Sequence, residues 1–224
     1  PRLNFVSGSQ GHRATLTRSA FTSGETLRVR VPAPKRGAIS AHVERDPQTG
    51  AAYFLAELPY DAREKLRPKT VSIFWDTSLS SLERDLSAER ELLLRYLETS
   101  GAKRAELFTF ALDQSEAIAF ANNRDGRQAL RAHLDALVYD GGTRYRALDF
   151  SKTSGDAILL FTDGVSSLGA GSPAAPGVPL FALNSLASTD HDFLERLASA
   201  TRGAYLNLTR LSAEQALERL GALS

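Results

Sequence analysis

From residue 70 onward, short apolar runs alternate with stretches in which leucine recurs at helical spacing. The clearest runs are Val71–Trp75, Ala105–Leu112, Ala157–Thr162 and Val178–Leu183. Such runs are typical of strands that are buried on both faces of a sheet. Strands that alternate with helices predict parallel pairing. We therefore expect an α/β, doubly wound domain with a mainly parallel central sheet flanked by helices.

The same pattern predicts the helices and the remaining strands. Helices are expected over Ser81–Glu98, from Asp125 through Leu137, over Asp190–Thr201 and over Ser212–Leu220, with further short strands at Ala117–Ala121 and Ala204–Leu208. Three capping boxes are expected to start helices: Ser80 with Glu83, Asp125 with Gln128, and Ser212 with Gln215. Gly203 and Gly221 are expected to end the last two helices, and Glu91 with Arg95 to form a helical ion pair.

Residues 1–66 show a different sequence pattern, which predicts a small antiparallel β region. Leu27–Val31 alternates apolar residues with arginine, and Ile39–Glu44 and Ala51–Leu58 flank the turn signal "RDPQTG". This β-rich segment is interpreted either as the remnant of a preceding β domain or as a flap on the main domain. The polar stretch "REKLRPK" at 63–69 marks the expected boundary. The predicted domains are therefore 1–66 and 67–224.

Composition excludes several classes of protein. The chain has 27 basic and 26 acidic residues, so its charge gives no field that would attract nucleic acid or an anionic membrane. No apolar stretch approaches the roughly 20 residues that span a bilayer. Cysteine is absent, which excludes disulfides and thiolate zinc sites and agrees with an oxidising compartment. Because methionine is also absent, we expect a segment of a larger protein.

Oxygen-bearing side chains follow the predicted strands in three short segments. These side chains are Asp76, Ser78 and Ser80 in "DTSLS", Thr143 in "DGGTRY" and Asp163 in "LLFTDG". In open α/β sheets, ligands bind beyond the carboxyl ends of the strands, so the fold is expected to bring these segments to one edge. Two carboxylates and three hydroxyls favour Mg²⁺ or Mn²⁺, with Ca²⁺ as a further candidate, over zinc or copper.

These five residues carry a resemblance to a known family. The chain from about 70 to 220 resembles a von Willebrand factor type A domain, whose metal-ion-dependent adhesion site consists of Asp-x-Ser-x-Ser, a later Thr and a later Asp. The resemblance implies a Rossmann-like fold and a divalent cation held by the five residues. It also implies a protein partner that presents an Asp or Glu carboxylate to the cation. The resemblance gives no catalytic residue, and a non-enzymatic role is expected.

The segment ahead of this domain resembles a second module. "AAYFLAELP" followed by "RPKTVSIFWDTS" is similar to the junction in bacterial proteins that join a vault/inter-α-trypsin (VIT) domain to a type A domain. That resemblance implies a periplasmic or cell-surface location, within a larger envelope protein. No membrane segment is expected within this chain.

The sequence departs from the family pattern at two places. Leu79 stands where relatives often have glycine, and a leucine restricts positive φ in that loop. The segment between Thr143 and Asp163 is short, so we expect only one or two helical turns there, and residues 164–179 show no helical periodicity. Arg144, Arg146 and Leu79 are candidates for partner contacts, with a solvated loop as the alternative for the two arginines.

Two other functions remain open from the sequence. A metal-dependent phosphohydrolase commonly carries a second acid two residues after the first, where this chain has Ser78. A structural assembly module with a vestigial metal site is the other alternative. Individually, Ser80 is also interpreted as a helix cap, Asp163 as a turn residue, Trp75 as sheet packing and His133 as a boundary residue.

Overall fold

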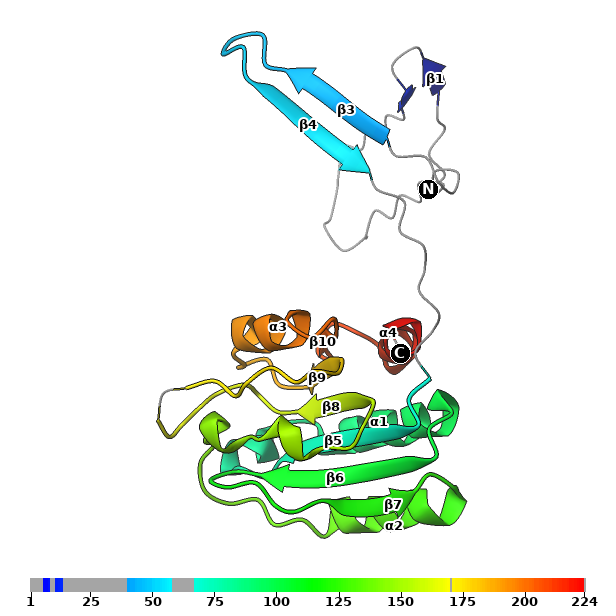
Figure 1. Cartoon of the computed structure of the whole chain (residues 1–224), viewed down its shortest axis with the longest axis vertical. Coiled ribbons are helices and arrows are strands. Elements are labelled where there is room, and N and C mark those ends of the chain that lie inside the picture. The colour runs from blue at the N-terminus through cyan, green and yellow to red at the C-terminus, as the bar shows by residue number, and fades with distance from the viewer. Residues whose placement is uncertain (1–5, 9–10, 14–39, 58–66, 170, 224) are drawn as a thin grey trace, which may run out of the picture. The chain divides into compact units, whose positions relative to one another are not determined.

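A computed structural model of the chain describes residues 6–8, 11–13, 40–57, 67–169 and 171–223 (Figure 1). The chain divides into two compact units, Pro1–Asp61 and Ala62–Ser224. The second unit contains the alternating strands and helices that the sequence predicts. The expected boundary after residue 66 falls at the end of a stretch outside the described residues and stays a prediction.

The second unit is built on a six-stranded sheet in the order β10-β9-β8-β5-β6-β7. Its strands are β5 (Thr70–Asp76), β6 (Arg104–Phe110), β7 (Ile118–Ala121), β8 (Ala157–Phe161), β9 (Leu180–Asn184) and β10 (Ala204–Asn207). All neighbours are parallel except β6 and β7. The doubly wound α/β prediction is therefore confirmed. From β5, the chain goes to β6 on one side and later returns to β8 on the other, so the switch point lies between β5 and β8.

Helices cover both faces of this sheet. They are α1 (Leu86–Ser100), α2 (Arg124–Asp135), α3 (His191–Ser199) and α4 (Ala213–Leu223). Side chains of α1, α2 and α4 share one apolar cluster with Ile73 and Trp75 of β5. Phe74, on the opposite face, packs in a second cluster with α3 and with the short 3-10 turns η2 (Tyr145–Ala147) and η3 (Phe150–Lys152). The two 3-10 turns confirm the expected short crossover.

The first helix does not begin as predicted. The 3-10 turn η1 (Leu79–Glu83) follows β5, and α1 begins only after Asp85, whose carboxylate accepts from the backbone N–H of Ala88 at 2.9 Å. Ser80 does not cap a helix, because its hydroxyl lies 3.2 Å from the Ser78 hydroxyl instead. Leu82, which lies within the helix predicted over Ser81–Glu98, belongs to η1 instead and is exposed.

Two further predictions about helix starts have different outcomes. Asn123, rather than Asp125, caps α2, and its side chain accepts from Gly126 N at 2.8 Å. The box at α4 is confirmed. There, Ser212 and Gln215 each accept a hydrogen bond from the other's backbone N–H.

The predicted helix ends and helical ion pair are corrected as well. Arg202, not Gly203, takes the left-handed conformation after α3, with φ of 65°. Gly203 is needed for another reason, since a Cβ there would lie 1.7 Å from the Leu180 carbonyl oxygen of β9. Helix α4 continues past Gly221 to Leu223. Glu91 and Arg95 pair with other helices, Glu91 with Arg131 of α2 and Arg95 with Glu214 of α4.

The described part of the first unit contains two hairpins. Strands β1 (Val6–Gly8) and β2 (Gly11–Arg13) pair antiparallel, as do β3 (Ser40–Arg45) and β4 (Ala52–Glu57). The β3–β4 hairpin confirms the antiparallel pair predicted around "RDPQTG". The predicted strand at Leu27–Val31 lies outside the described residues.

Candidate metal centre

The carboxyl ends of β5 and β8 bring the two candidate acids to neighbouring strands. Trp75 is the register partner of Phe161, so Asp76 comes one residue, and Asp163 two residues, after a paired position. Both side chains are buried, with relative exposures of 0% and 1%. An acid buried beside another acid is costly unless hydrogen-bond donors or a cation compensate it.

Hydrogen bonds fix both carboxylate oxygens of Asp76. Oδ1 accepts from the backbone N–H of Ser78 at 2.9 Å, and Oδ2 accepts from the Thr162 hydroxyl at 2.5 Å. Burial raises the pKa of the Asp76 carboxyl, and the nearby Arg84 guanidinium and the bonds from Thr162 and Ser78 oppose that rise. A cation bound beside this carboxyl would favour its charged form and so would also oppose the rise in pKa.

Three serine hydroxyls gather in the loop that follows Asp76. Ser78 Oγ lies 3.2 Å from Ser80 Oγ and 3.4 Å from Ser81 Oγ. Ser78 and Ser81 are buried, whereas Ser80 is exposed. Adjacent ligands of an octahedral cation that binds at about 2.1 Å lie about 3.0 Å apart. The spacing of the Ser78 and Ser80 oxygens therefore fits two neighbouring ligand positions.

The loop that carries Thr143 is joined to the loop after β5. Leu79 N–H donates to the Gly141 carbonyl at 3.0 Å, and Asp140 N–H donates to the Thr77 carbonyl at 3.0 Å. These backbone bonds hold the loops together on either side of the serine cluster. Thr143, two residues after Gly141, is itself buried.

Thr143 is also joined to the loop after β8. Its N–H donates to Ser167 Oγ at 2.8 Å, and its carbonyl accepts from the N–H groups of Ser167 and Leu168. Within that loop, Asp163 Oδ1 accepts from Val165 N–H at 2.9 Å, and Gly164 adopts a φ of +75°. The structure thus brings together the three segments that hold all five predicted ligands.

The residues present fit a divalent cation by their chemistry. Two carboxylates balance the charge of such an ion, and hydroxyl oxygens are ligands of hard cations. Within the described part of the chain, no cluster of three or more His, Cys, Asp or Glu is placed to hold a metal. A cation here would therefore depend on hydroxyl ligands as well as on Asp76 and Asp163.

Sequence reasoning missed three residues that support this site. Thr162 orients Asp76, and its hydroxyl lies 2.7 Å from the hydroxyl of Tyr145, which is buried in the short crossover. Burial raises the pKa of Tyr145 well above its usual value, and the charge of Asp76 adds to the rise. Arg84 donates to the Asp76 carbonyl at 3.1 Å. The one available signal was the position of Thr162, immediately before Asp163 in "LLFTDG".

Arg84 belongs to a buried ion pair beside the site. Its Nη1 lies 3.2 Å from Glu89 Oε2, with both side chains at 0% exposure, and its guanidinium lies 5.5 Å from the Trp75 ring centroid. Burial raises the pKa of Glu89, and Arg84 opposes that rise, as do the bonds from Ser185. The only tryptophan is fully buried, as its interpretation as sheet packing requires, and His133 is half-buried, as a boundary residue should be.

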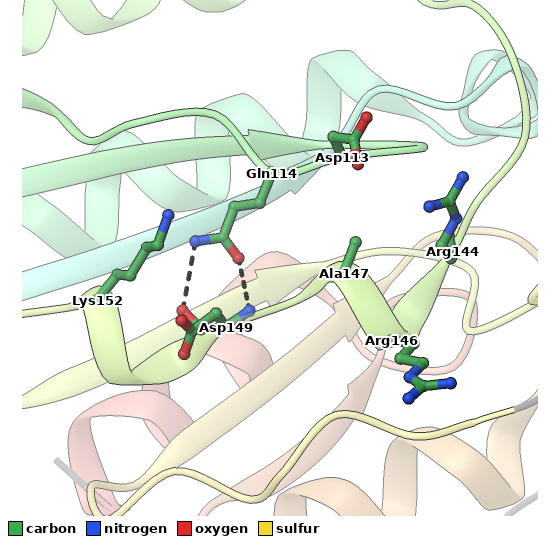
Figure 2. Close-up of a pocket in the computed structure, with 7 residues that line it drawn as sticks. All are labelled: Asp113, Gln114, Arg144, Arg146, Ala147, Asp149 and Lys152. Carbon is green, nitrogen blue, oxygen red and sulfur yellow. Dashed lines mark hydrogen bonds between the residues drawn. The ribbon is translucent and has the colours of Figure 1, made fainter.

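Leu79 does not strain the loop. Arg202 is the one non-glycine residue with positive φ among those described, so Leu79 occupies an ordinary backbone region at the start of η1. The side chain is 57% exposed, and Leu168 in the loop after β8 is also exposed. Arg144 and Arg146 are exposed too, and both line a pocket of about 420 Å³ (Figure 2).

The sheet order and the loops at its carboxyl edge agree with the family inferred from the sequence. The doubly wound sheet of the second unit is the fold that the resemblance to a von Willebrand factor type A domain implies. No family model matches the chain, and no curated protein matches it.

Solved structures show similarity at low sequence identity. An aerotolerance-related membrane protein from Bacteroides fragilis is 13% identical and has a TM-score of 0.49, over 67% of this chain and 96% of that one. BatB from Bacteroides thetaiotaomicron is also 13% identical, with a TM-score of 0.47, over 69% and 98%. Proximal thread matrix protein 1 from the mussel byssus, with a zinc-occupied MIDAS motif, is 13% identical and has a TM-score of 0.41, over 66% and 48%.

Proposed function

We propose that the second unit is a divalent-cation-dependent protein-binding module. Mg²⁺ or Mn²⁺, with Ca²⁺ as a further candidate, would be held by Asp76, Ser78, Ser80, Thr143 and Asp163. An Asp or Glu carboxylate of a protein partner would then complete the coordination of the cation. The observation that carries the proposal is the joining of three loops, which places four of these five oxygen-bearing side chains in buried positions at one sheet edge.

Binding is favoured over catalysis by what surrounds the two acids. Asp76 already accepts hydrogen bonds on both oxygens, and Asp163 accepts one from Val165 N–H. These bonds orient both carboxylates and still leave each oxygen a lone pair that a cation can use. Ser78, where a phosphohydrolase commonly has a second acid, supplies a hydroxyl that fits a ligand position. The proposed role is therefore adhesion rather than hydrolysis.

The proposal includes a place in the cell and a class of partner. The resemblance to bacterial VIT and type A proteins supports an extracytoplasmic location, periplasmic or at the cell surface, as part of a larger protein. Within the described residues, no helix has the length and apolar character needed to cross a membrane. The near balance of charge supports a protein partner rather than nucleic acid.

One observation favours a second candidate function, a structural assembly module that works without a cation. Protein donors already satisfy both oxygens of Asp76, and Arg84 supplies positive charge nearby. On this alternative the loops keep their arrangement without metal, and partner binding is insensitive to chelators.

Calorimetric titration with Mg²⁺ and Mn²⁺ tests the leading proposal. The wild-type protein should bind one cation, and Asp76→Ala should bind none, because the best-anchored carboxylate is lost. Asp125→Ala, an exposed acid on α2, is the matched control and should bind as the wild type does. Circular dichroism shows whether each variant is folded. Equal cation binding by wild type and a folded Asp76→Ala variant would rule out the proposed site.

A further inference from the structure

A polar pocket begins one residue beyond the Thr143 ligand position. It has a volume of about 420 Å³ and lies between residues 113–114, after β6, and residues 144–152 of the short crossover (Figure 2). The Arg144 N–H donates to the Ala111 carbonyl at 2.9 Å, which joins the two walls. The pocket is therefore part of the same sheet edge as the candidate metal centre.

Alternation along the crossover separates the two features. Thr143 and Tyr145 are buried, and the Tyr145 hydroxyl contacts Thr162 beside Asp76, whereas Arg144 and Arg146 are exposed and line the pocket. Extended backbone at Arg144, with φ of −123° and ψ of 95°, places its side chain opposite those of its two neighbours, and Arg146 follows within the 3-10 turn η2. One short stretch thus presents a ligand hydroxyl on one side and two guanidinium groups on the other.

The charge in the pocket is unevenly distributed. Within the described residues, neither Arg144 nor Arg146 makes an ion pair or a side-chain hydrogen bond. Lys152, by contrast, pairs with Glu116 at 3.4 Å. Figure 2 shows Arg144 and Arg146 at one end and Lys152 with Asp149 at the other.

The acids of the pocket do not neutralise its arginine end. Asp149 is held at the far end, where Ser151 donates to its carboxylate from both N–H and hydroxyl and Gln114 accepts from its backbone N–H. Asp113 is the remaining acid in the lining. Two guanidinium groups, those of Arg144 and Arg146, thus face a single nearby carboxylate, that of Asp113, and the arginine end of the pocket is positive.

We propose that this pocket is a second carboxylate subsite, so that the partner segment carries two acids. The inference rests on the proposed function: one acid binds the cation, and the second binds Arg144 and Arg146. Guanidinium groups bind carboxylates with charge-assisted, often bidentate hydrogen bonds. An acidic peptide segment is thus the partner chemistry that fits this surface.

The chain sets the spacing of the two acids. Consecutive Cα atoms are about 3.8 Å apart, so Arg146 lies at most about 11 Å from Thr143 along the backbone. An extended peptide advances about 3.3 Å per residue and covers about 10 Å of that distance in three residues. The second acid is therefore expected about three positions from the cation-binding one.

Peptide titrations followed by backbone NMR test this subsite. Three Gly/Ser octapeptides are compared in Mg²⁺ at physiological salt: one with a single Asp, one with Asp and Glu three positions apart, and one with the same two acids adjacent. The peptide with spaced acids should bind about two- to fivefold more tightly than the other two, as expected for one exposed ion-pair contact. The adjacent-acid peptide matches its charge and removes simple attraction as the explanation.

Variants connect that preference to the pocket. Arg144→Ala/Arg146→Ala should abolish the advantage of the spaced peptide and leave single-Asp binding unchanged, whereas Arg219→Ala, an exposed arginine on α4, should change neither. Asp113→Asn should strengthen binding of the spaced peptide. Equal affinities for the spaced and adjacent peptides, or an advantage that survives in the double variant, would overturn the subsite. A preference that persists unchanged in Asp76→Ala would support the subsite and contradict the proposed cation role.

Discussion

The loops after β5 and β8 begin alike and are held differently. Each follows a buried strand with a buried acid, Asp76 or Asp163. Asp76 is held by its own turn, through Ser78 N–H, and also by Thr162, the residue after β8, and it has the Arg84–Glu89 pair beside it. Asp163 is held by its own turn, through Val165 N–H. The two acids have equivalent positions in the sequence pattern, but their surroundings differ. The stability of the loop after β5 therefore depends more on charged side chains.

Removing Arg84 should have the largest effect on this difference. Arg84→Met leaves Glu89 buried without its counter-charge, and breaking a buried pair in this way costs about 3–5 kcal/mol of unfolding free energy. Denaturant titration in the absence of metal measures the loss.

The rescue of this variant tests the cause of its destabilisation. In Arg84→Met/Glu89→Gln, the amide oxygen still accepts from Ser185, so much of the loss should be recovered. Arg131→Met, which breaks an exposed pair, is the control and should cost less than about 1 kcal/mol. A double variant no more stable than Arg84→Met would show that lost packing against Trp75 dominates.

Substitutions that change the backbone freedom of the two loops should alter the unfolding free energy less than the loss of Arg84 does. Gly164→Ala places a side chain at φ of +75° and a Cβ 3.0 Å from the Asp190 carbonyl, so it should cost about 2 kcal/mol. Leu79→Gly in the loop after β5 relieves no strain and should cost about 0.5–1 kcal/mol through chain entropy. Thermal unfolding of both variants gives the comparison. A Leu79→Gly variant more stable than wild type would mean that the leucine is strained after all.

Much of the fold was predictable because buried strands leave a local signal. Continuous apolar runs mark β5 and β8 wherever their partners lie, and the parallel arrangement then sets the shared edge of Asp76 and Asp163. The ligand set was recognisable for the same reason. Its metal-binding role remains a prediction.

Other features depended on contacts that are distant in sequence. Glu89 accepts from Ser185, which is 96 residues away, and Gly203 is required by a carbonyl of β9. The start of α1 was wrong because Ser80 fits a capping pattern locally, while its hydroxyl lies beside that of Ser78 in the folded loop. Local patterns do not show which of two partners a hydroxyl takes.

The pH dependence of the unfolding free energy tests whether the burial of the charged Asp76 carboxylate lowers stability. Burial raises its pKa in the folded state above the value of about 3.9 in unfolded chains. The folded state therefore holds the proton more tightly, and stability falls as pH rises from the unfolded pKa through the folded one. Asn does not ionise at this position. As pH rises across that window, the unfolding free energy of Asp76→Asn should therefore increase relative to that of the wild type, by no more than about 1.4 kcal/mol per pH unit.

Unfolding of both proteins from pH 3 to pH 7 in a metal-free buffer measures that relative gain. Glu89 contributes equally to both and cancels in the difference. Glu83→Gln, an exposed neighbour, is the control and should follow the wild type. Mg²⁺ should restore wild-type stability at pH 7 and leave Asp76→Asn unchanged, because the cation replaces the proton as the compensating charge. A difference between variant and wild type that is constant with pH would show that hydrogen bonds from Thr162 and Ser78 already offset the burial of Asp76.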